Sequence, residues 1–166
     1  MDKAVLEVER LFRTAMRRYP ATVTIVTTRH GSLDAGMTAT AVTSVSMEPP
    51  ALLVCVNRGV GFHTAIENAG EFCVNVLREE QQEMAAAFGG GKPPHERFTD
   101  GTWQRLDGVP YLPKAQANIF CRRTAVFPYG THSIVIGEVI RLHLHDEVAP
   151  LIYVDGRYAA VGCNLG

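Results

Sequence analysis

Short apolar segments rich in β-branched residues dominate this chain, and residues typical of turns separate them. Such segments run over residues 22–28, 35–43, 51–57 and 71–77. Because β-branched side chains favour strands and Gly or Pro residues end them, the pattern predicts strands that follow one another directly. Regular alternation of strands with helices is missing, and no G-x-G-x-x-G motif follows the first strand, so a Rossmann fold is not expected.

The remaining segments complete a mainly β fold. Strands are also expected over 115–125, 133–145 and 151–154 with its continuation over 157–161, and helices over the N-terminal segment up to Pro20, over 62–68 and over 79–88. The stretch over 44–50 ends in two prolines, which cannot donate to a ladder, so we expect a loop or an edge there. The segment between 89 and 112 is expected to be a flexible and irregular loop region. Six or seven strands with a few short helices predict an antiparallel barrel.

Size and charge limit the classes of function. The chain has 166 residues, which is typical of one domain over 1–166, and a net charge of −1. A nucleic-acid or anionic-membrane partner favours a basic surface, which this charge does not supply. The start lacks the apolar run of a signal peptide, and no apolar stretch is long enough to cross a bilayer, so a cytoplasmic protein is expected.

The cysteines and histidines give no metal-binding pattern. The four cysteines, Cys55, Cys73, Cys121 and Cys163, contain no C-x-x-C pair, so buried free thiols are expected rather than a zinc or disulfide framework. His143 and His145 fall on one face of a strand, but no third ligand stands at a suggestive spacing. We therefore expect no metal and interpret both as exposed strand histidines.

Five segments, in order along the chain, resemble the flavin reductase family with the FMN-binding split barrel. They are Phe12-Arg13 with Ala15-Met16 and the strand over 22–27, then 36–50 (GMTATAVTSVSMEPP), 72–77 (FCVNVL), 132–139 (HSIVIGEV) and 151–158 (LIYVDGRY). This resemblance implies a six- to seven-stranded antiparallel split barrel that forms a homodimer. It also implies an NAD(P)H-dependent flavin reductase that reduces FMN or FAD and supplies the reduced flavin to a partner monooxygenase of aromatic or polyketide-antibiotic metabolism.

The stretch over 38–46 is the expected wall of the flavin slot. Its side chains are small and rich in hydroxyls, so the backbone can approach a flat ring and the hydroxyls can meet its carbonyls and ribityl chain. The alternative is an ordinary strand in which Thr and Ser reflect β propensity. The cofactor contacts expected here are Met37, Thr38, Ala39, Thr40, Ser44, Val45 and Ser46.

The turn that follows the third strand is the expected phosphate site. Arg58 supplies a fixed positive charge, Gly59 and Gly61 permit a tight turn, and the next helix adds unpaired N–H groups. The alternative is a solvated turn with an exposed arginine. The expected contacts are Asn57, Arg58, Phe62, His63 and Thr64, although the family commonly has a serine-rich version where this chain has Gly61-Phe62-His63.

His132 is the catalytic-site candidate. The family often shows Gly-Asp-His before this strand, whereas this chain has Gly130-Thr131-His132. A neutral imidazole can hydrogen-bond and orient the nicotinamide nucleotide, while the hydride passes directly from nicotinamide to flavin. The alternative is a histidine at a strand edge that has no role.

The C-terminal Gly-Arg-Tyr motif adds two more candidates. Arg157 is expected to face cofactor phosphates and Tyr158 to cap the slot, with a core or interface tyrosine as the alternative. Two other functions stay open: a flavoenzyme of this fold that acts directly on a pathway intermediate, and a non-catalytic barrel that binds a ligand.

Overall fold

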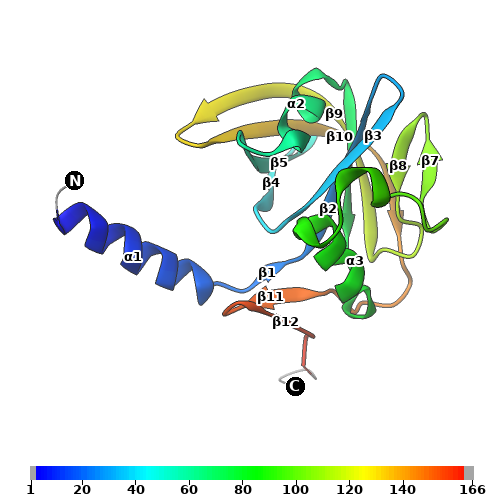
Figure 1. Ribbon diagram of the computed structural model, residues 1–166. Coiled ribbons are helices and arrows are strands. Elements are labelled where there is room, and N and C mark those ends of the chain that lie inside the picture. Colours follow the sequence, from blue (N-terminus) through cyan, green and yellow to red (C-terminus); the bar gives the residue numbers. More distant parts are fainter. Residues whose placement is uncertain (1–2, 163–166) are drawn as a thin grey trace.

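The computed structural model describes residues 3–162, and its centre is a seven-stranded antiparallel sheet (Figure 1). The strand order is β3-β2-β6-β9-β10-β5-β4. The strands are β2 (Thr24–His30), β3 (Leu33–Ala39), β4 (Val42–Met47), β5 (Pro50–Asn57), β6 (Glu71–Val76), β9 (Ala117–Tyr129) and β10 (His132–Leu144). The predicted mainly β, antiparallel architecture is confirmed.

The connection between β3 and β4 makes the sheet curl. These two strands are consecutive in sequence, yet they form the two opposite edges of the sheet. Only Thr40 and Ala41 separate them, and two residues between the strand ends can span no more than ~10 Å. The edges therefore meet at this end, where Cys55 N–H donates to the Ala41 carbonyl (3.0 Å). Because β3 and β4 do not pair with each other among the described residues, the barrel is split rather than closed.

Helices and two small sheets flank the large sheet. The helices are α1 (Lys3–Arg17), α2 (Gly61–Asn68) and α3 (Gln82–Ala86), with one-turn helices at Glu79–Gln81, Ala87–Gly91 and Pro94–Glu96. One small sheet contains β1 (Ala21–Thr22), β11 (Ile152–Val154) and β12 (Arg157–Ala159), and the other is the hairpin of β7 (Gln104–Leu106) and β8 (Val109–Tyr111).

Helix α1 projects away from the rest of the chain (Figure 1). Its C-terminal end is fixed to the β11–β12 turn, because Asp155 N–H donates to the Arg17 carbonyl (2.6 Å) and the Arg17 guanidinium donates to the Asp155 carbonyl (3.2 Å). Several of its large apolar side chains are exposed: Phe12 is 65% exposed and Val8 is 66% exposed. An exposed apolar helix face of this kind is typical of a protein–protein contact.

Two groups of buried side chains form most of the core. The first lies inside the curled sheet and under α2, and includes Val54, Ile66 and Phe72. The second lies between the sheet and the segment over 84–115, and includes Ile25, Phe88 and Trp103. Burial of large apolar side chains supplies the main stabilising free energy, at about 1.5–3 kcal/mol for each one.

Three local expectations differ from the structure. The strand expected over 35–43 is two strands, because the chain crosses from one sheet edge to the other at Thr40 and Ala41. The helix expected over 79–88 is broken into three short helices as it folds back over the sheet. The irregular segment before Leu112 contains the β7–β8 hairpin, whose turn uses Asp107 and Gly108 at positive φ.

The thiols of Cys73 and Cys121 are buried, as expected, and Cys55 is half-buried. Burial raises the pKa of Cys121 to about 12 and also raises the pKa of Cys73, so both remain protonated near neutral pH. Cys163 lies outside the described residues. No helix found between residues 3 and 162 has both the length and the apolarity needed to cross a membrane.

Candidate functional site

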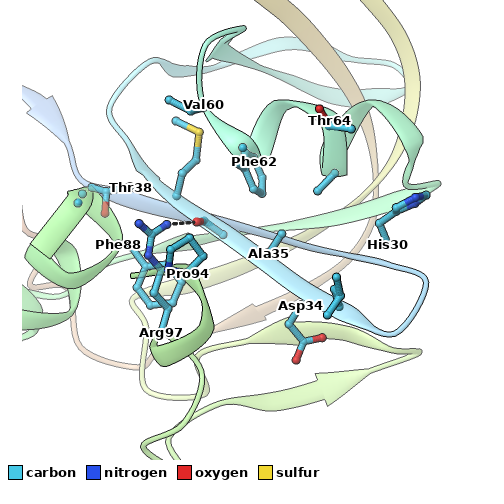
Figure 2. A pocket seen from close by; sticks show the side chains of 17 residues that line it. His30, Asp34, Ala35, Thr38, Val60, Phe62, Thr64, Phe88, Pro94 and Arg97 are labelled. Atoms are coloured by element: carbon cyan, nitrogen blue, oxygen red, sulfur yellow. Dashed lines mark hydrogen bonds between the residues drawn. The ribbon is translucent and has the colours of Figure 1, made fainter. Parts of the chain in front are cut away.

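A cavity of about 570 Å³, called here the main cavity, opens between β3, the start of α2 and the segment over 88–97 (Figure 2). Sites for cofactors commonly have volumes of ~300–1,000 Å³. Its lining residues are His30, Leu33, Asp34, Ala35, Gly36, Met37, Thr38, Val60, Gly61, Phe62, Thr64, Ala65, Phe88, Gly89, Gly90, Pro94 and Arg97. The main cavity is therefore large enough for much of a flavin nucleotide.

Strand β3 forms one wall of the main cavity. Gly36 is required there because a Cβ at this position would lie 2.8 Å from Phe88 Cε1 and 3.2 Å from Phe98 Cζ. Thr38 also lines the cavity, and its hydroxyl donates to the Ala85 carbonyl (2.6 Å). These contacts join the strand to the segment that forms the opposite wall.

The start of α2 forms the second wall. Val60 is the N-cap of this helix, and no side chain caps it among the described residues. The first-turn N–H groups and the helix dipole favour an anion at such an end. Thr64 adds a hydroxyl on the same side of the cavity, and Phe62 adds an aromatic ring (Figure 2). This wall suits the phosphate end of a nucleotide.

The turn before α2 is fixed to the β9–β10 hairpin. Asn57 Oδ1 accepts from Gly59 N–H (2.8 Å), which shapes the turn. Arg58 N–H donates to the Thr131 carbonyl (2.9 Å), and the Arg58 guanidinium donates to the Gly130 carbonyl. The side chains of Asn57 and Arg58 are exposed, so a ligand at this turn can reach them.

His132 lies beside the same turn. It faces Asn57 in the β10–β5 register, and its Nδ1 is 2.9 Å from the Thr131 hydroxyl. The imidazole is exposed. The structure thus brings Asn57, Arg58 and His132 together, although the three are not lining residues of the main cavity.

The third wall carries the residue that sequence reasoning missed, Arg97. Its Nη1 donates to the Gly36 carbonyl and its Nε to the Lys92 carbonyl (both 3.0 Å), and its guanidinium lies 5.8 Å from the Phe88 ring centroid. Phe88 packs against Phe98 and Trp103, with centroids 5.0–5.1 Å apart. Burial lowers the pKa of Arg97. The position of Arg97 between a Gly/Pro-rich stretch and Phe98 is the sequence signal that could have indicated a cavity residue here.

The predicted flavin contacts are divided among several places. Met37, Thr38, Phe62 and Thr64 line the main cavity. Thr40 lines a second cavity of about 630 Å³, which Cys55, Arg13 and Tyr153 also line. Ser44 and Ser46 line a groove of about 410 Å³, whereas Ala39 is buried in the core and Val45 is exposed. The stretch over 38–46 is therefore not one continuous wall.

Two further sets of predicted residues lie apart from the main cavity. The His63 ring is buried, with Nε2 2.8 Å from Ser133 Oγ and 3.2 Å from Glu67 Oε1. Arg157 and Tyr158 belong to β12: Arg157 pairs with Asp155 (3.4 Å), and Tyr158 packs against Tyr153 (centroids 5.5 Å apart). Burial raises the pKa of Tyr158.

Within the described part of the chain, no group of three or more His, Cys, Asp or Glu side chains is placed to hold a metal ion. His143 packs edge-on against Tyr111 and Phe120. His145 Nδ1 is 3.0 Å from Nη1 of the buried Arg78, which also pairs with Glu80.

A curled antiparallel sheet that is open between two edge strands, with a nucleotide-sized cavity on one edge, defines a split-barrel ligand-binding protein. Residues 16–162 match the flavin reductase like domain. The chain therefore belongs to the flavin reductase like family, and the resemblance found in the sequence is confirmed.

Individual relatives agree with this family. The reductase component of the FADH(2)-dependent resorcinol hydroxylase of Rhizobium sp. (strain MTP-10005) is 50% identical over 90% of this chain and 85% of its own. FMN reductase (NADH) RutF 2 of Rhizobium rhizogenes is 41% identical over 90% of this chain and 87% of its own. Streptomyces globisporus NADH:FAD oxidoreductase SgcE6, solved in complex with NAD and FAD fragments, is 28% identical and superposes with a TM-score of 0.88 over 95% of each chain.

Proposed function

We propose that this chain is an NAD(P)H:flavin oxidoreductase that reduces FMN, or FAD, and supplies reduced flavin to a separate monooxygenase. One observation carries the proposal: a chain of the flavin reductase like family has a nucleotide-sized cavity with mostly apolar walls and an uncapped helix start. The relatives named as FMN reductase and as a hydroxylase reductase component support the reaction and the partner.

The residues of the main cavity fit a flavin. Met37, Phe62 and Phe88 supply the apolar surface that a flat ring needs, and Gly89 and Gly90 leave room beside it. The start of α2, with the Thr64 hydroxyl and the nearby Arg58, would hold the phosphate. When bound, flavin supplies the acceptor for the hydride of NADH or NADPH. The protein's own part is to orient the two nucleotides and to exclude water between them.

His132 is proposed to bind and orient the nicotinamide nucleotide. Its exposed imidazole stands at the end of β10, next to the turn that would hold the flavin phosphate. A hydrogen bond from this ring fixes a nucleotide without any proton transfer from the protein. Thr131, in the place of the family's common aspartate, is 2.9 Å from the ring and keeps a hydrogen-bond partner for Nδ1.

The active form is proposed to be a homodimer in the cytoplasm, where a pool of NADH or NADPH is maintained. Helix α1 projects with its apolar side chains exposed, and a second copy would cover them. Because a diffusing product must be released, we expect flavin binding on the order of micromolar (~−8 kcal/mol).

The test is anaerobic absorbance spectroscopy of the purified protein with FMN, and separately with FAD, before and after NADH is added. Loss of the oxidised flavin bands, with stoichiometric oxidation of NADH, is expected. Bound flavin that neither NADH nor NADPH reduces would overturn the reductase function in favour of a flavoenzyme that acts directly on a pathway intermediate. Absence of flavin binding would indicate a non-catalytic barrel.

A further inference from the structure

Arg97 is the one lysine or arginine among the described residues that line the main cavity. It comes from the segment after the one-turn helix at Pro94–Glu96, and its guanidinium is turned toward β3 (Figure 2). Arg97 is half-buried. Arg97 gives the cavity a permanent positive charge, because arginine stays charged at any working pH, whereas the carboxylate in the lining, Asp34, is paired with Arg29 and Arg105.

The guanidinium is held firmly but is not neutralised. The carbonyls of Gly36 and Lys92 accept from Nη1 and Nε, and the Phe88 ring lies beneath the group. Within the described residues no carboxylate lies within ion-pair distance of Arg97, and no hydrogen bond uses Nη2. A guanidinium has five N–H donors, so donors remain for a ligand in the cavity.

The position of Arg97 separates it from the proposed phosphate end. Thr64, on α2, and Arg97 lie well apart across β3 (Figure 2). A flavin whose phosphate lies beside the Thr64 hydroxyl therefore has its ring, rather than its phosphate, toward Arg97, Phe88 and Thr38. This placement rests on the proposed function.

The proposed reaction creates a negative charge on that ring. NADH gives up a hydride, which is a proton with two electrons, and becomes NAD⁺; the neutral oxidised ring accepts the hydride and becomes the anionic reduced ring. We propose that Arg97 stabilises this negative charge, so that the protein binds reduced flavin more tightly than oxidised flavin. A fixed cation at a developing anion lowers the free energy of the product without reorganisation of the site.

The test compares Arg97→Gln and Arg97→Lys with the wild type, with FMN and with riboflavin, which lacks the phosphate. Fluorescence titration gives the affinity of the oxidised form, and the midpoint potential of the bound flavin gives the preference for the reduced form. For Arg97→Gln we expect a loss of about 10-fold in that preference, equal to a potential about 30 mV lower for a two-electron couple. The loss should be the same for FMN and riboflavin.

Two controls separate charge from structure. Arg97→Lys keeps the charge and should retain most of the wild-type potential. Lys114→Ala removes an exposed cation that lines no described cavity and does not contact Arg97, and should leave the potential unchanged.

An unchanged potential in Arg97→Gln would overturn the proposal. An equal loss of flavin affinity in both redox states would also overturn it. A loss of affinity for FMN but not for riboflavin would overturn it as well, because it would make Arg97 a phosphate ligand. Failure of the wild type to bind flavin in either redox state would instead overturn the proposed function itself.

Discussion

His63 Nε2 lies 2.8 Å from Ser133 Oγ, and this hydrogen bond joins the first turn of α2 to the strand that begins at His132. Both side chains are buried. The pair therefore connects the element proposed to hold the flavin phosphate with the residue proposed to orient the nicotinamide. The sequence predicted that His63 contacts the flavin phosphate directly. Its buried ring instead contacts Ser133, next to His132, so any effect on the ligand would pass through these neighbours.

Replacing His63 with Ala should destabilise the protein by about 1–3 kcal/mol, because Ser133 Oγ would be left buried without this partner. Urea unfolding of His63→Ala, Ser133→Ala and the double variant measures the coupling, which we expect at about 0.5–3 kcal/mol. His63→Gln retains a polar atom near Nε2 and should recover part of the loss. Strict additivity of the two single substitutions would show that the hydrogen bond contributes nothing to stability.

Arg58→Ala should weaken FMN binding by about 1.5–3 kcal/mol through the loss of a charge-assisted hydrogen bond to the phosphate. Fluorescence titration with FMN and with riboflavin checks the cause, since only FMN should lose affinity. The matched control is Lys114→Ala, which removes an exposed cation that lines no described cavity. Equal losses for both ligands would assign the effect of Arg58 to the shape of the turn, which it fixes through the Gly130 carbonyl.

His132→Ala should raise the KM for NADH by about 2- to 10-fold, which corresponds to one lost hydrogen bond, with flavin affinity little changed. Steady-state kinetics at saturating FMN, together with an FMN titration, separate the two effects. Thr131→Ala should give a smaller rise, because it removes only the partner of Nδ1. A fall in kcat at unchanged KM would contradict the binding role of His132.

The positions of the strands along the chain could be predicted better than the arrangement of the site. β-branched runs indicated most of the strands, and the double proline indicated a loop or an edge over 44–50, where β4 ends at an edge of the sheet, because these signals are local. The orientation of His63 also had a local signal: residues 63 and 66 share a helix face, and Ile66 is a core residue. By contrast, Arg97 meets β3 only because the segment after α3 folds back over Gly36, a contact between residues 61 apart in sequence. The Gly/Pro-rich stretch before Arg97 marks the residue itself, but no spacing in the sequence indicates its contact with β3.

Gly137 of β10 is a further residue whose small size the fold requires. A Cβ at this position would lie 2.5 Å from Phe72 Cζ and 2.7 Å from Cys121 Cβ, both in the core inside the curled sheet. Overpacking of this kind commonly costs about 1–3 kcal/mol, so Gly137→Ala should lower the free energy of unfolding by about that amount. Urea denaturation monitored by circular dichroism measures the change.

Gly70→Ala is the matched control for Gly137→Ala, because a Cβ at Gly70 meets no atom within 4 Å and its backbone is not at positive φ. This control should unfold near the wild-type midpoint, since surface changes without new contacts commonly stay within about 0.5 kcal/mol. If both variants unfolded at the same urea concentration, the core would accommodate a Cβ at residue 137, and the close approach of β10 to Phe72 would not restrict the size of that residue. A lower midpoint for Gly137→Ala alone would support tight packing of Phe72, on β6, against β10.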